Sequence, residues 1–285
     1  MFGKRYDGRL VRTIEPLPRL IPYIMKKRTD AQNLFSDEVY CRPLDEYIRD
    51  KKEAGIKLDY MKIIIAAMVR LNALFPALNR FVMNGRIYAR NSIWTSFVVQ
   101  KDLRDESAET TVKLKFDGTE SIFTVSSMID DAIRNAADKS KNTETDDLSR
   151  TLDRIPGFLC KWAVNILMFM DRHNVMPKKV IDASPFHTSF FITNLKSLGI
   201  NYIYHHIYEF GTTGVFIALG KERERVVPGI AEKFALEHVT TIGIVTDERF
   251  CDGLYFAKAM RRLKKILRDP SVLEDALLKK VEDIP

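Results

Sequence analysis

The chain has 285 residues, with 46% hydrophobic and 29% charged residues and a net charge of +7, and this length is enough to bury a substantial core. Residues 1–5 are basic but lead into no apolar core or cleavage site of a signal peptide, and the apolar run 158–170 is interrupted and too short to span a bilayer. The three cysteines have neither paired nor metal-like spacing, which is typical of a reducing compartment. We therefore expect a cytoplasmic protein without membrane contact.

Almost all of the excess charge lies in residues 1–28, which hold eight Lys and Arg against two acidic residues. No aromatic-interleaved platform or recognition helix accompanies these charges, so we expect no nucleic-acid partner. The segment is interpreted as a basic N-terminal arm or helix that is solvated and packed by its apolar residues. A site for an anionic ligand is the alternative.

Apolar periodicity predicts alternating helices and strands in the first half of the chain. Residues 14–28 have helical spacing, but three prolines predict a late or broken start. Residues 59–74 form the clearest helix, with Asp59 as N-cap and a stop at the Phe-Pro-Ala-Leu-Asn run of 75–79. The other elements predicted here are a strand at 36–41, a helix at 43–54, strands at 86–89, 92–99 and 112–116, and a helix at 127–137.

The second half begins with the polar segment 138–150, which predicts a surface loop. Residues 155–173 predict a helix whose Met and aromatic side chains are typical of a core or a subunit interface. No glycine-rich phosphate loop and no internal repeat is found, so we predict one α/β domain over residues 1–285, built on a mixed sheet. The remaining predicted elements are strands at 189–193, 215–219 and 240–245 and a final amphipathic helix with Phe256, Met260, Leu263 and Leu267 on one face.

A short motif follows the last predicted strand. Residues 246–253 read Thr-Asp-Glu-Arg-Phe-Cys-Asp-Gly and lead directly into the final helix. This order resembles the catalytic domain of the dihydrolipoamide acyltransferases (the 2-oxoacid dehydrogenase acyltransferases) and the chloramphenicol acetyltransferases, which read His-x-x-x-Asp-Gly here. Glu248 stands where those families have the histidine. Segments 57–67, 75–79, 117–123 and 189–199 carry the same resemblance in the same order.

The resemblance implies a fold class: α/β, a two-layer sandwich with a mixed sheet of the chloramphenicol acetyltransferase type. It also implies a homotrimer whose active site lies in a channel between subunits, with coenzyme A or acyl-CoA as substrate, a small-molecule acyl acceptor and no metal. No lipoyl domain is expected, and residues 139–185 are longer than either family needs, so they are interpreted as an insertion specific to this chain. In this context the phosphates of coenzyme A are the anion that residues 1–28 would hold.

Site residues carried over by position are Glu248 as general base, Thr193 as the hydroxyl that stabilises an oxyanion, and Asp252 as a structural carboxylate. Gly253 would permit a close turn into the helix, and Arg19 is the candidate partner of Asp252. Thr193 is equally well explained as a β-branched strand residue without a chemical role.

Glu248 decides whether the chain is an enzyme, a question that the sequence leaves open. A carboxylate of pKa about 4.3 that deprotonates a thiol of pKa about 8.5 faces about four pKa units, near 6 kcal/mol. Burial could raise the pKa of the glutamate, but a negative base also repels the thiolate that it creates. Two functions therefore stay open: acyl transfer from coenzyme A to a thiol, hydroxyl or amine, or a catalytically impaired homologue that binds a ligand or acts as a scaffold.

Other residues could take part in less direct ways. His187 or the His205-His206 pair could replace the missing imidazole, although loop histidines are more often surface or packing residues. Cys251 is interpreted as an apolar filler and not as a nucleophile. Metal binding by Glu248 and Asp252 is a remote alternative because no third ligand is apparent.

Overall fold

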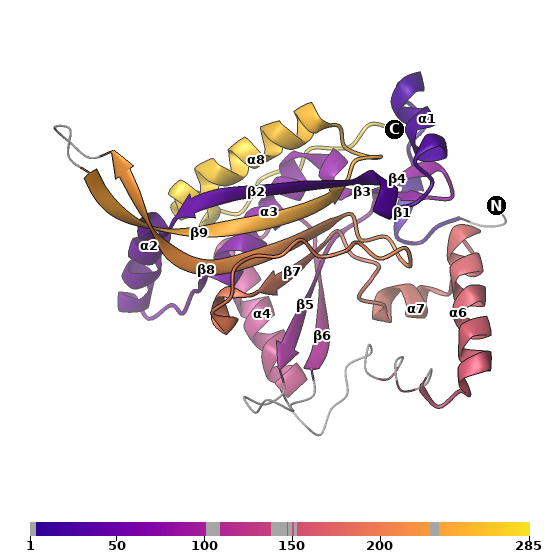
Figure 1. Ribbon diagram of the computed structural model, residues 1–285, viewed down its shortest axis with the longest axis horizontal. Coiled ribbons are helices and arrows are strands. Elements are labelled where there is room, and N and C mark those ends of the chain that lie inside the picture. Colours follow the sequence, from indigo (N-terminus) through magenta and orange to yellow (C-terminus); the bar gives the residue numbers. More distant parts are fainter. Residues whose placement is uncertain (1–3, 101–108, 138–146, 148–149, 151–152, 229–233) are drawn as a thin grey trace.

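The computed structural model describes residues 4–100, 109–137, 147, 150, 153–228 and 234–285. A six-stranded mixed sheet in the order β2-β9-β8-β7-β5-β6 forms the centre of the chain, and a three-stranded antiparallel sheet in the order β1-β4-β3 lies at one end (Figure 1). The strands are β1 Gly8–Leu10, β2 Gln32–Tyr40, β3 Arg80–Met83, β4 Arg86–Arg90, β5 Ile93–Gln100, β6 Glu109–Phe116, β7 Phe190–Asn194, β8 Val215–Pro228 and β9 Phe234–Asp247.

Helices cover the large sheet mainly on one face, which makes a two-layer α/β arrangement (Figure 1). The helices are α1 Pro16–Ile24, α2 Cys41–Glu53, α3 Tyr60–Leu74, α4 Ile122–Ala137, α6 Gly157–Arg172, α7 Lys178–Ala183 and α8 Gly253–Arg268. Short 3-10 turns span Thr29–Ala31, Pro76–Asn79, Lys196–Leu198 and Pro270–Leu273.

Helix α3 is the centre of the helical layer. It packs against α4, α8 and β5, and twelve of its fifteen residues are buried. A helix that is apolar on nearly all sides requires such complete coverage. Asp59 begins it as predicted, because its carboxylate accepts the backbone N–H of Lys62 at 2.9 Å.

Strand β7 is parallel to both of its neighbours, β5 and β8, whereas the other strand pairs of the large sheet are antiparallel. Phe190 at its start pairs with Val215 of β8, which in turn pairs with Thr246 of β9. The first residues of β7 and β8 and the last residues of β9 therefore lie at the same end of the sheet, and the motif follows β9 there.

The predicted fold class is confirmed, and most predicted elements exist with shifted ends. Helix α4 begins at Ile122 instead of residue 127, and β1 and β3, which the sequence did not indicate, pair with β4. Most of the predicted loop 138–150 lies outside the described residues. Among the described residues, no helix combines the length and the apolar character that crossing a bilayer requires.

The interpretation of residues 1–28 as a solvated arm packed by its apolar residues is correct only in part, because six of its eight cations are exposed as expected. Arg5 and Arg28 are buried in ion-pair clusters, while Leu17, Leu20 and Ile24 of α1 are more than half exposed. The apolar stripe of α1 therefore faces outward in this chain.

Candidate functional site at the end of β9

The motif forms a tight junction between β9 and α8. Strand β9 ends at Asp247, a turn over residues 248–250 follows, and Asp252 is the N-cap of α8. The Asp252 carboxylate accepts the backbone N–H of Tyr255 at 2.9 Å and complements the partial positive charge of the helix N-terminus. In the structure Asp252 therefore acts as a helix cap.

Gly253 opens α8, but its backbone does not require a glycine. Its φ angle is not positive, and a Cβ added at this position would meet no atom within 4 Å. The chain therefore turns into α8 without the conformational freedom of glycine that the sequence led us to expect.

Asp247 is buried and paired on both oxygens. Arg249 Nε lies 2.8 Å from Asp247 Oδ1 and Arg249 Nη2 lies 2.7 Å from Oδ2, while Arg28 Nε lies 3.8 Å from Oδ2. Arg28 also donates to the carbonyls of Tyr208 and Glu209 at 2.9 Å each. Burial lowers the pKa of Arg28, and the Asp247 carboxylate opposes this shift. This cluster, which the sequence did not indicate, ties the motif to the segment after α1.

Glu248 is the remaining acidic residue of the motif. Its backbone N–H donates to Ala31 O at 2.9 Å, which fixes the turn against the start of β2. The side chain is half-buried, and its carboxylate has no hydrogen-bond or ion-pair partner within the described part of the chain. No cluster of three His, Cys, Asp or Glu side chains that could hold a metal occurs among the described residues. Among the described residues, Glu248 is thus the one motif carboxylate without a hydrogen-bond or ion-pair partner.

Thr193 and Glu248 do not meet within one chain. Thr193 is half-buried in β7 and pairs with Ala218, which pairs with Gly243 of β9. Glu248 is five residues beyond Gly243, which is roughly 16 Å along the strand, and two strand spacings add about 10 Å across the sheet. A single reacting carbonyl cannot contact both side chains of the same protomer.

Arg19 and Asp252 are not paired. Arg19 is exposed on α1, and no ion pair between it and Asp252 is found in the described structure. The expectation that Arg19 holds Asp252 is therefore wrong for this chain. The arginines that hold the motif are Arg249 and Arg28, and the carboxylate that they hold is Asp247.

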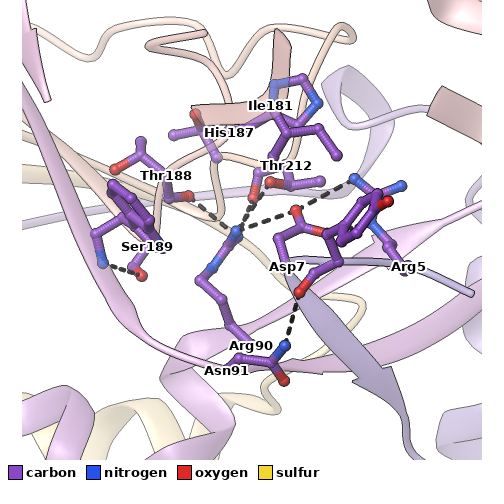
Figure 2. Close-up of polar contacts among 12 residues, drawn as sticks. Arg5, Asp7, Arg90, Asn91, Ile181, His187, Thr188, Ser189 and Thr212 are labelled. Atoms are coloured by element: carbon purple, nitrogen blue, oxygen red, sulfur yellow. Dashed lines mark hydrogen bonds and ion pairs between the residues drawn. The ribbon is translucent and has the colours of Figure 1, made fainter. Parts of the chain in front are cut away.

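His187 lies in a second buried polar cluster, and Figure 2 shows it near Arg5 and Asp7. Its Nε2 is 3.1 Å from Asp171 Oδ2, and its Nδ1 is 2.8 Å from Ser184 Oγ. Arg5 Nη2 pairs with Asp171 Oδ1 at 2.8 Å, and Arg5 Nε pairs with Asp7 at 2.7 Å. Because both ring nitrogens are engaged and the side chain is fully enclosed, His187 does not offer a free imidazole to a substrate in this conformation.

The other candidate groups are packing residues. His205 is half-buried and stacks on Phe216 with ring centroids 4.3 Å apart, and burial, assisted by His206, lowers the pKa of His205. Cys251 is buried, and burial raises the pKa of its thiol to about 12. The interpretation of Cys251 as an apolar filler fits this environment, because a nucleophilic cysteine needs a lowered pKa.

A basic groove of about 440 Å³ lies beside the motif. Lys26, Lys27 and Arg172 are exposed along it, and Glu209 is its acidic residue. The groove also reaches Arg249 of the motif. Three solvated cations around one concave surface create a positive potential that favours an anionic ligand.

Comparison with known proteins decides the fold. No protein-family model and no curated protein matches the sequence. Among solved structures, the dihydrolipoamide acetyltransferase of Azotobacter vinelandii matches with a TM-score of 0.58 at 13% identity and covers 95% of each chain. The fold is that of the dihydrolipoamide acyltransferase catalytic domain and of chloramphenicol acetyltransferase.

Two further structures agree with this result. A probable dihydrolipoamide acetyltransferase of Listeria monocytogenes matches with a TM-score of 0.52 at 16% identity, over 90% of this chain and 93% of the other. A chloramphenicol acetyltransferase matches with a TM-score of 0.52 at 11% identity, over 91% of this chain and 99% of the other. At such low identity the likeness establishes the fold and leaves the activity to the site residues.

Proposed function

We propose that this chain is a coenzyme-A-dependent acyltransferase in which Glu248 occupies the general-base position. The observation that supports the proposal is how the motif carboxylates are paired. Asp247 forms an ion pair with Arg249 and Asp252 caps α8, whereas the Glu248 carboxylate has no partner among the described residues. In the Azotobacter vinelandii enzyme of the same fold, a serine, a histidine and an asparagine have been investigated for roles in the catalytic mechanism. Thr193, Glu248 and Asp252 are the residues that this chain offers for those roles.

The proposed reaction breaks the thioester C–S bond of acyl-CoA and forms a bond between the acyl carbon and the acceptor. Glu248 takes the acceptor's proton and returns it to the departing coenzyme A thiolate, while the Thr193 hydroxyl donates a hydrogen bond to the oxyanion. An amine acceptor suits a carboxylate best, because its proton leaves after attack, from a positively charged nitrogen. A thiol acceptor is harder to deprotonate, because its pKa lies about four units above that of a glutamate carboxyl.

The proposed enzyme is a homotrimer with its site between subunits. The separation of Thr193 and Glu248 within one chain supports this arrangement, since the two groups can meet one substrate only if they come from different copies. The basic groove beside the motif would hold the phosphates of coenzyme A, with Lys26, Lys27 and Arg172 as the cations.

A non-enzymatic trimeric binding or scaffold protein is the second candidate. The observation that favours it is the absence of an available imidazole at the motif: Glu248 replaces it, and His187 is enclosed by Asp171 and Ser184. Such a protein would bind coenzyme A without turning over acyl-CoA.

Release of free coenzyme A from acetyl-CoA, measured with an amine, a hydroxyl and a thiol acceptor in turn, tests the proposal. Glu248→Gln should lower kcat/KM by about 10²- to 10⁴-fold, the usual contribution of a general base. Glu53→Gln, at the exposed end of α2, is the matched control and should not change the rate. Equal rates for wild type and Glu248→Gln would remove Glu248 from the chemistry.

Calorimetric titration with coenzyme A separates the two candidates. Binding without turnover by any acceptor would support the binding protein. Glu248→His then asks whether only the base is missing, because a gain of turnover in that variant would show that the rest of the site is competent.

A further inference from the structure

Helix α6 is apolar, and one of its faces is uncovered. Of its sixteen residues only Asp171 is buried, while Phe158 is 76% and Trp162 65% exposed and Phe169 is more than half exposed. A helix that is apolar on several sides is normally enclosed by protein. Figure 1 shows α6 standing at one end of the molecule, away from the helical layer.

The attachment of α6 explains how it can stand there. The helix is anchored at its last turn, where Asp171 pairs with Arg5 and His187, and the apolar side chains of its other face are only half-buried. Two buried polar contacts at one end fix the direction of the helix and leave its aromatic side chains available to another surface.

A second apolar surface is uncovered at the same end of the molecule (Figure 1). Leu17, Leu20 and Ile24 lie on one face of α1, at steps of three and four residues, and Ile24 is 73% exposed. This stripe is next to the motif, because Arg249 Nη1 donates to Met25 O at 3.3 Å just beyond the end of α1.

We propose that α6 of one copy packs on the α1 stripe of the next copy, in a head-to-tail contact between identical chains. This inference rests on the trimeric assembly of the proposed function, and it assigns a role to the helix in the chain-specific segment 139–185. A three-fold ring requires two different complementary patches on each chain. The exposed faces of α6 and α1 supply two such patches, whereas α6 pairing with itself would leave the α1 stripe uncovered.

Area and charge support a second copy as the occupant. Three aromatic side chains exposed to this degree present on the order of 400 Å², about half of the roughly 800 Å² that a stable interface buries on each partner. In a head-to-tail contact the α1 stripe of the next copy is the other side, so the aromatic face of α6 supplies about half of one side of such an interface. Residues 158–170 carry a single charge, Lys161, so the helix offers neither an acidic nor a basic partner a complementary surface and lacks the cationic face of a membrane-surface helix.

Sedimentation velocity over a concentration series tests the contact through the mass of the assembly. Wild type should sediment at three times 32.9 kDa. Trp162→Glu in α6 and Leu20→Glu in α1 should each raise the dissociation constant by at least about tenfold, because a charge replaces a central apolar contact. Val272→Glu, at an exposed apolar position outside both helices, is the matched control and should leave the mass unchanged.

Mixing the two variants distinguishes a head-to-tail contact from other contacts between the chains. The Trp162→Glu chain retains an intact α1 and the Leu20→Glu chain retains an intact α6, so the mixture should form a two-chain species more readily than either variant alone. No gain on mixing would overturn the head-to-tail contact, as would a trimer that tolerates both substitutions. A wild-type chain that stays monomeric, including one that instead sediments with anionic phospholipid vesicles, would overturn it too.

The test of the α6–α1 contact can fail or succeed separately from the test of acyl transfer. A trimer that survives both substitutions contradicts the α6–α1 contact and leaves acyl transfer untouched. A trimer that depends on the contact but releases no coenzyme A contradicts acyl transfer and leaves the contact in place. Circular dichroism spectra of the two variants verify that each chain is folded before its mass is interpreted.

Discussion

Asp171 Oδ2 lies 3.1 Å from His187 Nε2, and this contact joins the end of α6 to the segment that enters β7. Burial lowers the pKa of His187 although Asp171 opposes the shift, so the imidazole is neutral near pH 7. Its Nε2–H then donates to Asp171, and its Nδ1 accepts the Ser184 hydroxyl at 2.8 Å. The positive charge that balances Asp171 is supplied by Arg5, at 2.8 Å from its other oxygen.

Removal of the Asp171 charge should destabilise the chain strongly. Asp171→Asn leaves the buried Arg5 guanidinium with Asp7 as its near carboxylate partner. We expect a loss of about 3 kcal/mol in the free energy of unfolding, the usual cost of breaking a buried ion pair from one side. Urea unfolding at pH 7 measures it.

Asp182→Asn is the matched control for that substitution. Asp182 forms an ion pair with Lys178 one helical turn away in α7, where the lysine side chain is largely exposed. Removal of an exposed pair should cost less than about 1 kcal/mol. Losses of similar size in the two variants would contradict a special role for the buried cluster.

The neutral state of His187 predicts a pH dependence of stability. An unfolded histidine takes up a proton near pH 6.5, whereas the buried His187 does so only at lower pH. The unfolded state therefore binds more protons, and the free energy of unfolding should fall as the pH drops below about 6.5. Above that pH the contribution of His187 is complete.

His187→Gln tests the assignment, because an amide retains hydrogen-bonding groups but does not titrate in this range. The slope of stability against pH between about 6.5 and 5 should become smaller in this variant. It should not vanish, since burial also lowers the pKa of His205. An unchanged slope would mean that a group other than His187 causes the pH dependence of stability.

Asp171 also makes the free energy of unfolding depend on pH, but in a lower pH range than His187. Burial alone would raise the pKa of its carboxyl, but His187 and Arg5 bring it down to about 2. Its contribution is present above the ordinary aspartate pKa of about 3.9 and is lost as the pH falls toward 2.

The parts of the fold that the sequence predicts well are those set by local pattern. Helix α3 begins at its Asp59 cap and ends at Leu74 because apolar spacing, a capping carboxylate and a following proline all act within a few residues. The motif position follows in the same way from an apolar strand and an amphipathic helix. Both predictions need no knowledge of distant partners.

The buried polar clusters could not be predicted because their members are far apart in the chain. Arg5 and Asp171 are separated by 166 positions, and neither shows in the sequence as anything but a solvated charge. A charge is buried only when the folded chain brings a partner to it. Similarly, the exposed stripe of α1 has the spacing of a core-facing helix, and nothing local shows that the folded chain leaves it outside the core.

Two glycines should respond in opposite ways to substitution by alanine. Gly211 has a φ of +87°, and a Cβ there would lie 2.3 Å from Phe186 O, so Gly211→Ala should cost more than about 2 kcal/mol. Gly253 has open space and an ordinary φ, so Gly253→Ala should be neutral or stabilise the chain by up to about 1 kcal/mol. Urea midpoints of the two variants compare them directly. A large loss at Gly253 would show that the β9–α8 junction is tighter than its geometry indicates.

The capping role of Asp252 predicts which replacements the motif tolerates. Asp252→Ala removes the acceptor of the Tyr255 N–H and should cost about 1 kcal/mol, whereas Asp252→Ser and Asp252→Asn keep an acceptor and should cost only a few tenths. If capping is its whole contribution, coenzyme A release by the serine variant should stay within about threefold of wild type once the protein is folded. A serine variant with wild-type stability but with turnover reduced by about 10²-fold or more would instead mean that the carboxylate itself acts on Glu248 or on the substrate. Thermal unfolding and initial rates on the same preparations give the two readouts, and their agreement or divergence separates a structural carboxylate from a chemical one.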